Sequence, residues 1–366
     1  MKICFLVADI SHTGGVERVT SNLAGALKQS VEDIDIEIVS QFKSEPKLWY
    51  SFDGCTIHYL NGKDYEAKPH SLKRMFRILG NVSRVRRFFK SHHYDYIISQ
   101  SFPNTALLYM AGICMKNVLA VEHVKYDYYN NLIKSFRLHV YKKTAKVVVL
   151  TNNDKECYDR YLHSTQTIQI PNPVVVPEYR QSPLNKKQAV AIGRLQYQKG
   201  FDTLTDVYEI VHQKHPEWIV NIYGNGNYRK QIERHIKAKG LENIVILKGR
   251  TDNVPAVLGE SAFFILSSRF EGFGMVIAEA MSQGLPVVSF NCPTGPADIV
   301  KTDFNGILVE NQNVEKMADA ICYMIENPEE RKRMGKNALS TAKCFGGDII
   351  ASQWIQLFDS LRHESR

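Results

Sequence analysis

The sequence lacks an apolar run long enough to span a bilayer, which argues against a transmembrane helix. Its N-terminal stretch MKICFLVADI has seven apolar residues and one lysine before Asp9, too few apolar residues for a secretory signal. The seven cysteines are scattered, with no CxxC spacing, so we expect reduced thiols rather than disulfides or a metal cluster. These absences predict a cytoplasmic protein.

Two ligand-binding motifs are also missing. The chain has no G-x-G-x-x-G fingerprint, which argues against a dinucleotide oxidoreductase or a non-catalytic nucleotide-binding module. A D-x-D sequence usually marks a metal site when it follows a strand. Asp33 and Asp35 have this spacing but precede the second expected strand, so we interpret them as surface acids and expect no metal.

The net charge of +8 is unevenly distributed along the chain. Residues 1–182 carry a net charge of +7, whereas residues 183–366 carry +1. Much of the excess lies in residues 67–94, which hold eight Lys or Arg residues and no acid. We therefore expect the N-terminal half to meet an anionic partner.

Short apolar runs alternate with longer helical patterns along nearly the whole chain, which predicts parallel sheets covered by helices on both faces. Two such series of strands indicate two doubly wound α/β domains, joined by a polar linker at 176–187. The expected strands are 2–8, 34–40, 55–60, 94–99, 117–122, 145–150 and 167–170 in the first series, and 188–193, 218–224, 243–249, 262–268, 285–290 and 305–310 in the second.

Ligands of open parallel sheets bind at the carboxyl ends of the strands, so the informative loops follow strands. Gly14 and Gly15 follow the first strand and open a helix, where backbone could approach an anionic ligand, although a plain turn would look the same. His123 ends the fifth strand, either as a surface histidine or as a polar group at the binding edge. Gly224 follows a strand of the second series and gives a tight turn.

Arg194 and Lys199 bracket the loop after the first strand of the second series. Two cations five positions apart can converge on a pair of phosphates, the arginine as a fork and the lysine as a point charge. A solvated basic loop is the alternative. This loop is therefore a candidate phosphate site.

The segment RFEGFGMVIAEAM joins a strand to a helix and carries two carboxylates, Glu271 and Glu279. Its glycines expose amides at the positive end of a helix, where they could hold a phosphate. Glu279 lies within an apolar helical stretch, where a buried carboxylate needs partners such as ribose hydroxyls. An ordinary exposed glutamate is the alternative. The amides belong to Phe273, Gly274, Met275 and Val276.

The E-x7-E pattern of EGFGMVIAEAM, together with TGGVER, IPNPV, IGRLQYQKGFDTL and GLPVVSF in this order, resembles the retaining glycosyltransferases of family 4 over the whole chain. The resemblance implies the GT-B fold, with two Rossmann-like doubly wound domains facing each other across a cleft. It implies an acceptor-binding domain at 1–178, a nucleotide-sugar donor domain at 179–345, and a C-terminal helix at 346–366 that packs back on the N-terminal domain.

The resemblance also assigns roles to residues. Arg194 and Lys199 would neutralise the donor diphosphate, Glu279 would bind the ribose, and Glu271 would face the donor sugar. The backbone at Phe273, Gly274 and Met275 would contact phosphate or sugar. The Gly14–Gly15 turn would close over the diphosphate, and His123 would lie near the donor sugar. The loop at 292–300 departs from the family wording, and we expect it to flank the sugar or the acceptor.

The implied reaction is metal-independent and uses no cofactor. The expected donor is a UDP-hexose or UDP-N-acetylhexosamine, and the acceptor a glycan, most plausibly a lipid-linked polysaccharide, O-antigen, capsule or lipopolysaccharide precursor of a bacterium. A GDP-mannose-dependent mannosyltransferase and a GT-B-fold sugar-nucleotide epimerase are the alternatives. The basic stretch could rest on the anionic inner membrane or pack its apolar stripe on its own sheet; no nucleic acid is expected.

Overall fold

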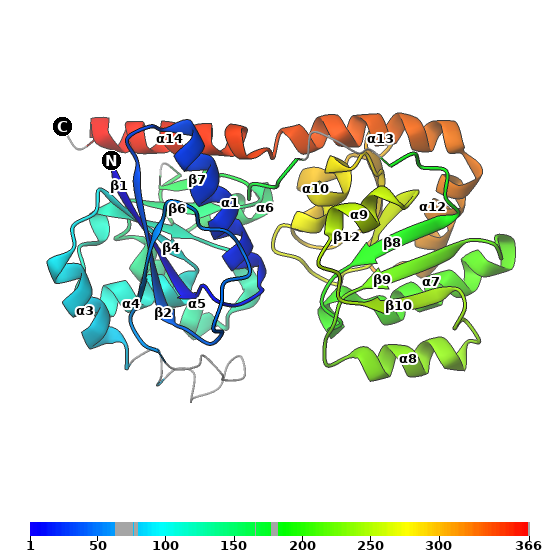
Figure 1. The fold of residues 1–366 in the computed structure, drawn as a ribbon, viewed down its shortest axis with the longest axis horizontal. Coiled ribbons are helices and arrows are strands. Elements are labelled where there is room, and N and C mark those ends of the chain that lie inside the picture. Colours follow the sequence, from blue (N-terminus) through cyan, green and yellow to red (C-terminus); the bar gives the residue numbers. More distant parts are fainter. Residues whose placement is uncertain (63–75, 77–79, 165, 177–181, 365–366) are drawn as a thin grey trace. The chain divides into compact units, whose positions relative to one another are not determined.

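The computed structural model describes the chain except for residues 63–75, 77–79, 165, 177–181 and 365–366. The chain forms two compact units (Figure 1). The N-terminal unit comprises residues 1–173 and 347–366, and the C-terminal unit comprises residues 174–346. The expected linker at 176–187 lies partly outside the described residues. No helix in the described part of the chain is long and apolar enough to cross a membrane.

The N-terminal unit is built on a seven-stranded parallel sheet with the order β3-β2-β1-β4-β5-β6-β7. The seven strands expected from the sequence are all present, with ends shifted by one or two residues. They are β1 (Lys2–Asp9), β2 (Asp35–Phe42), β3 (Thr56–Tyr59), β4 (Tyr96–Gln100), β5 (Val118–Val121), β6 (Lys146–Val149) and β7 (Thr167–Gln169).

Helices cover both faces of this sheet, which explains why its central strands are continuously apolar. Ile3 and Phe5 of β1 pack on one face with α1 and α14, whereas Cys4 and Leu6 pack on the other with α3, α4, α5 and α6. Figure 1 shows α14 alongside α1. The helices are α1 (Gly15–Ser30), α3 (Val82–Ser91), α4 (Phe102–Met110), α5 (Asn131–Tyr141), α6 (Asn152–Asp159) and α14 (Gly347–Glu364).

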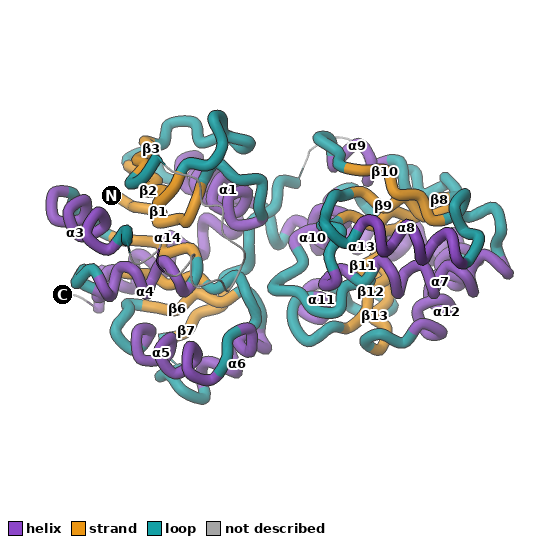
Figure 2. The backbone as a smooth tube through the Cα atoms, turned by 90° about the horizontal axis from the view of Figure 1, so that it is seen from below, coloured by secondary structure: helices purple, strands orange, loops and turns teal. Residues whose placement is uncertain are grey.

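The C-terminal unit repeats this plan with a six-stranded parallel sheet in the order β10-β9-β8-β11-β12-β13. All six expected strands are present: β8 (Gln188–Ile192), β9 (Ile219–Tyr223), β10 (Val245–Gly249), β11 (Phe263–Leu266), β12 (Val287–Asn291) and β13 (Gly306–Glu310). The helices, visible in Figure 2, are α7 (Phe201–Lys214), α8 (Arg229–Ala238), α9 (Val254–Gly259), α10 (Met275–Ser282), α11 (Pro296–Ile299), α12 (Val314–Glu326) and α13 (Pro328–Lys343).

Each sheet has one point at which the strand order reverses. In the N-terminal unit it lies between β1 and β4, and in the C-terminal unit between β8 and β11. At such a switch point the loops that follow the two strands turn away from each other and leave room for a ligand. The switch points therefore single out the loops after β1 and β4 in one unit, and after β8 and β11 in the other.

Candidate active site

The switch point of the C-terminal unit brings together two residues that lie far apart in the sequence. Lys199 ends a short 3₁₀ turn after β8 (Tyr197–Lys199), and its Nζ lies 2.6 Å from Glu271 Oε1 in the loop after β11. Glu271 is only 6% exposed, and its Oε1 also accepts a hydrogen bond of 2.5 Å from Ser268 Oγ. A lysine and a glutamate from both predicted loops thus form one partly buried ion pair.

Glycines let the backbones around this pair approach closely. Gly200 has φ +62°, and a Cβ there would lie 2.2 Å from the carbonyl oxygen of Ser267. Gly224 has φ +149°, and a Cβ there would lie 1.8 Å from the carbonyl oxygen of Gly193. Side chains are excluded at both positions by sterics as well as by conformation. The predicted tight turn at Gly224 thus packs against the end of β8.

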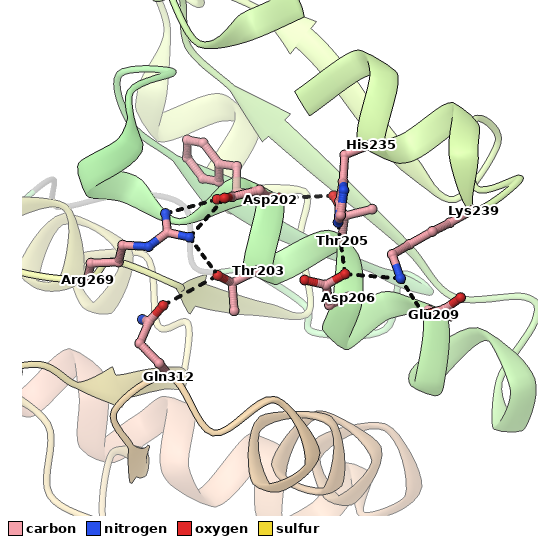
Figure 3. Close-up of polar contacts among 10 residues, drawn as sticks. Asp202, Thr203, Thr205, Asp206, Glu209, His235, Lys239, Arg269 and Gln312 are labelled. Atoms are coloured by element: carbon pink, nitrogen blue, oxygen red, sulfur yellow. Dashed lines mark hydrogen bonds and ion pairs between the residues drawn. The ribbon is translucent and has the colours of Figure 1, made fainter. Parts of the chain in front are cut away.

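Arg269, in the loop after β11, binds Asp202 at the start of α7, as Figure 3 shows. Its guanidinium donates to both carboxylate oxygens of Asp202 at 3.0 and 2.8 Å. It also donates to the Tyr197 carbonyl oxygen at 2.6 Å, which joins the loops after β8 and β11. The same group lies 4.1 Å from the centroid of the Tyr197 ring. Burial opposes ionisation of Asp202, but the hydrogen bonds from Arg269 outweigh it and lower the pKa of this carboxyl. Arg269 was not among the predicted site residues.

The helix that follows Glu271 begins with unpaired amides. Gly274 precedes α10 with φ +85°, and no side chain caps the helix. Within the described residues, the N–H groups of Met275 and Val276 have no acceptor. Phe273 is buried, with its ring 5.6 Å from that of Phe345. The first turn of α10 thus offers free donors and the positive end of a helix beside the Lys199–Glu271 pair.

Glu279 lies on the accessible stripe of α10 rather than in its core-facing stripe. Met275, Val276 and Glu279 are half-buried, whereas Ile277 and Ala278 are buried. Residues three and four apart share one side of a helix, so Glu279 lies on the same side as the first turn. Glu279 is therefore half-buried, because its apolar neighbours face the other way, and its contact with a ribose stays a prediction.

Arg194 is exposed, and its side chain makes no hydrogen bond or ion pair with the described residues. Its place in the loop between β8 and Lys199 keeps it near the ion pair along the chain, with Gly193 and Leu195 hydrogen-bonded to β9 and the loop that follows it. A cation without a protein partner in this loop is available for an anionic ligand.

The loop after β12 supports the Glu271 loop. Thr294 Oγ1 donates a hydrogen bond to the Glu271 carbonyl oxygen. Gly295 has φ +97°, and a Cβ there would lie 2.4 Å from the Phe273 carbonyl oxygen. Cys292 is buried, and burial together with the charge of Glu271 raises its thiol pKa to about 12. The segment at 292–300 therefore packs against the backbone of Glu271–Phe273.

In the N-terminal unit, His123 follows β5 and its Nε2 lies 2.5 Å from Gln100 Oε1 at the end of β4. Desolvation lowers the pKa of His123 to about 4, so the ring is neutral at pH 7. The preceding Glu122 is buried and turns instead to Tyr141, which donates to its Oε1, and to Arg137, whose Nη1 lies 3.7 Å from its Oε2. Gln100 was missed because one glutamine within an apolar strand carries no pattern.

Gly14 and Gly15 form the start of α1, as expected. Gly14 has φ −85° and ψ 176°, no side chain caps the helix, and both glycines are exposed. A Cβ on Gly15 would meet nothing within 4 Å. The local fold therefore does not demand glycine at position 15.

Family models and related proteins match most of the chain. Residues 13–176 match the family model described as Glycosyltransferase Family 4, and residues 177–341 match the one described as Glycosyl transferases group 1. An uncharacterized glycosyltransferase of Haemophilus influenzae is 28% identical, covering 96% of this chain and 98% of its own length. The amylovoran biosynthesis glycosyltransferase AmsD of Erwinia amylovora is 27% identical, covering 98% and 99%.

A crystal structure of S. aureus TarM in complex with fondaparinux, α-GlcNAc-glycerol and UDP superposes with a TM-score of 0.80. The match covers 98% of this chain and 99% of TarM at 19% sequence identity. At this identity the likeness establishes the shared architecture of two Rossmann-like domains, the GT-B fold.

Proposed function

Because this chain belongs to glycosyltransferase family 4, a family of retaining hexosyltransferases, we propose that it transfers a hexose or N-acetylhexosamine from a UDP-sugar to a glycan acceptor. The observation that carries the proposal is the Lys199–Glu271 pair beside the free amides of α10, at the switch point of the C-terminal unit. Cations and helix amides recognise a diphosphate, and a carboxylate recognises sugar hydroxyls.

The ion pair holds Lys199 in place before the donor arrives. When a nucleoside diphosphate enters, Lys199 and Arg194 bond to its phosphate oxygens, and the first turn of α10 donates its N–H groups. Glu271 then exchanges the lysine for hydroxyl groups of the sugar. Donors preorganised at the position where charge develops stabilise the transition state strongly because they need no reorganisation during the reaction.

The chemistry follows from this charge distribution. The bond between the anomeric carbon and the diphosphate oxygen breaks, and the electron pair leaves with the nucleoside diphosphate. The acceptor hydroxyl attacks the same face of the sugar, so that the configuration is retained, and its proton passes to the departing phosphate oxygen. Glu279, on the accessible side of α10, would accept hydrogen bonds from the ribose hydroxyls.

Lys199, Arg194 and the α10 amides supply the positive charge that a metal ion would otherwise provide, so we propose that transfer needs no metal and no cofactor. Turnover of UDP-sugar should be unchanged after dialysis against EDTA. A loss that is restored by Mg²⁺ or Mn²⁺ would contradict this part of the proposal.

The donor is tested with a thermal-shift panel of UDP-, GDP- and ADP-sugars, because a bound ligand stabilises the folded state by mass action. UDP-hexoses and UDP-N-acetylhexosamines should raise the unfolding temperature more than GDP-mannose. Stabilisation by GDP-mannose alone would replace the proposal with a mannosyltransferase. Product analysis with UDP-sugar and no acceptor separates a transferase from an epimerase, since only the epimerase would convert the sugar.

The acceptor is proposed to be a lipid-linked glycan, in line with the amylovoran biosynthesis named for AmsD and the glycan ligands named for TarM. We propose that the N-terminal unit binds it at an anionic membrane surface. Between Glu66 and Glu122 the only acidic residue is Asp95. On α3, Val85 and Phe89 are buried, while the basic residues face solvent; these are Arg84, Arg86, Arg87 and Lys90.

This arrangement reconciles the two interpretations of the basic stretch, because the apolar stripe of α3 packs on its own sheet and the charges remain outside. Most of residues 67–81 lies outside the described residues. Each exposed Lys or Arg near an anionic leaflet contributes about 1 kcal/mol.

Flotation with vesicles of phosphatidylglycerol and phosphatidylcholine at low salt tests the membrane proposal. The wild type should float, and the double variant Arg86→Ala/Arg87→Ala should float less. The matched control Lys230→Ala/Lys237→Ala removes two exposed cations from α8 of the C-terminal unit and should float like the wild type. No binding of the wild type to anionic vesicles would refute the proposal.

A further inference from the structure

The tautomer of His123 is determined by one buried neighbour. Gln100 and Val121 are paired in the register of β4 and β5, which brings the Gln100 side chain beside the residue two positions beyond Val121. His123 Nε2 lies 2.5 Å from Gln100 Oε1, and Gln100 is 1% exposed. An amide oxygen only accepts, so this contact favours the tautomer with the proton on Nε2 and the lone pair on Nδ1.

The backbone of Gln100 is itself held by a chain of buried amides. Asn104 Nδ2 donates to the Gln100 carbonyl oxygen at 2.5 Å, and Gln41 Nε2 donates to Asn104 Oδ1 at 2.6 Å. Asn81 Nδ2 donates to Gln41 Oε1 at 3.4 Å. All four residues are buried. A connected polar network of this kind fixes positions more tightly than isolated bonds.

Backbone strain is present at the next residue. Ser101 has φ +96° and ψ 152°, a conformation that is costly for any residue except glycine. Its N–H donates to the Val121 carbonyl oxygen at 2.9 Å, and its carbonyl oxygen accepts from Asn104 at the start of α4. Surrounding bonds thus maintain a strained turn immediately after Gln100.

The amide nitrogen of Gln100 is buried without a hydrogen-bond partner. The unpaired nitrogen costs stability, whereas the oxygen of the same amide provides the acceptor for His123 Nε2. The strain at Ser101 and the unpaired nitrogen of Gln100 both oppose stability. Both features accompany the hydrogen bond that His123 Nε2 donates to Gln100 Oε1.

We propose that Gln100 is a positioning residue that holds His123 in its neutral Nε2–H form, leaving Nδ1 as the acceptor for a hydroxyl group of the sugar substrates. This proposal rests on the proposed function. Within the described residues Nδ1 has no partner. The neighbouring charge, Glu122, turns to Arg137 and Tyr141 instead of the imidazole.

The tautomer is measured directly by NMR of ¹⁵N-histidine-labelled protein, with the His123 signals assigned by comparison with His123→Asn. We expect Nε2 to be protonated and its proton to be visible and protected from exchange. In Gln100→Met this proton signal should shift or broaden because its acceptor is gone. A wild-type His123 protonated on Nδ1, or an Nε2–H signal unmoved in Gln100→Met, would overturn the proposal.

Gln166→Met is the matched control. Gln166 is a half-buried glutamine of the same unit whose amide donates to the Tyr141 and Thr144 carbonyl oxygens at 2.6 and 3.1 Å. Its loss removes two hydrogen bonds elsewhere in the unit. The His123 Nε2–H signal should therefore remain in place, which separates a specific effect from a general loosening of the fold.

Kinetics supply a second measurement. Gln100→Met should lower kcat about tenfold, the loss of roughly one hydrogen bond in the transition state, with unchanged UDP affinity by calorimetry. Gln100→Glu should favour the charged imidazolium, so its activity should be low at neutral pH and recover as the pH rises. A purely structural glutamine would give no such recovery.

Ser101→Gly relieves the strain and should raise the unfolding midpoint while lowering kcat, because the turn no longer fixes Gln100. Equal or higher kcat in Ser101→Gly would count against the proposal. A chain that transfers no sugar would refute the proposed function. The NMR measurement on His123 requires no activity, so it tests the role of Gln100 independently.

Discussion

The two units share one plan of winding but place different chemistry at their switch points. In the C-terminal unit, Lys199 and Glu271 bring opposite charges together beside unpaired helix amides. In the N-terminal unit, the corresponding edge carries neutral amides around His123, and the buried charges of Glu122 and Arg137 face each other. We therefore propose that the C-terminal unit stabilises negative charge and that the N-terminal unit orients hydroxyl groups.

The largest effect is expected at Lys199. Lys199→Ala removes a preorganised cation from the leaving group, and kcat/KM should fall by about 10²–10³-fold. UDP affinity should fall as well. Lys187→Ala, which removes an exposed lysine from the same unit, is the control and should leave both unchanged. Wild-type turnover in Lys199→Ala would mean that the charge of Lys199 does not assist the reaction, which would contradict the charged role proposed for the C-terminal unit.

A smaller effect is expected from the clamp between Arg269 and Asp202. Asp202→Asn weakens a two-point bond between side chains that are 22% and 17% exposed, and should destabilise the C-terminal unit by about 2 kcal/mol. Activity should fall further than stability explains, because Lys199 and Glu271 lie on the two loops that the clamp joins. Urea unfolding and steady-state kinetics measure the two effects.

Lys239→Ala is the control for the Arg269–Asp202 pair. Lys239, at the end of α8, pairs with Asp206 and Glu209 of α7, the helix that also carries Asp202 (Figure 3). These partners are more exposed, so the loss should stay below about 1 kcal/mol with normal turnover. Equal effects of Asp202→Asn and Lys239→Ala on turnover would mean that Arg269 does not position the site.

The stability of the N-terminal unit should depend on pH, because burial shifts the pKa values of two of its side chains. Burial, opposed by Arg137 and Tyr141, raises the Glu122 pKa from 4.5 to about 7. The folded state then binds more protons than the unfolded state between these values, so this group's contribution to stability is lost as pH rises. Burial lowers the His123 pKa from 6.5 to about 4, so its contribution is lost as pH falls.

With rising pH, Glu122 lowers the free energy of unfolding and His123 raises it, so the two effects oppose each other between about pH 4.5 and 6.5. Single variants should separate them. In Glu122→Gln only the pH dependence of stability that comes from His123 remains. The urea midpoint of this variant should therefore fall as the pH is lowered from 6.5 to 4.5. In His123→Gln only the pH dependence of stability that comes from Glu122 remains. The urea midpoint of this variant should therefore rise or stay constant as the pH is lowered over the same range. Identical pH dependence in both variants would contradict the assignment.

The smallest effect is expected at Gly15, and Gly224 provides the contrast. Gly15→Ala meets open space at the start of a helix, so stability should change by less than about 0.5 kcal/mol. Gly224→Ala places a Cβ 1.8 Å from a carbonyl oxygen and should destabilise clearly. Reduced turnover in Gly15→Ala at unchanged stability would indicate that a ligand approaches this helix end.

The strands and the loops after them could be predicted from the sequence because each depends on a local pattern of apolar residues and turns. The clamp could not, because Asp202 and Arg269 are brought together only by the order of β8 and β11 in the sheet. Gln100 was hidden for the same reason: its partner depends on the register of β4 against β5. The burial of Glu279 could not be predicted, because an apolar sequence does not reveal which side of a short helix is covered.

The chain builds most of the N-terminal unit, then the C-terminal unit, and then returns to the N-terminal unit with α14, and this order affects folding during synthesis on the ribosome. The core of the N-terminal unit includes Trp354, Leu357 and Phe358 of α14, so one face of its sheet stays only partly covered until α14 emerges. The C-terminal unit is a single continuous segment and has all its residues earlier. We therefore expect the C-terminal unit to finish folding first, while the N-terminal unit waits for α14.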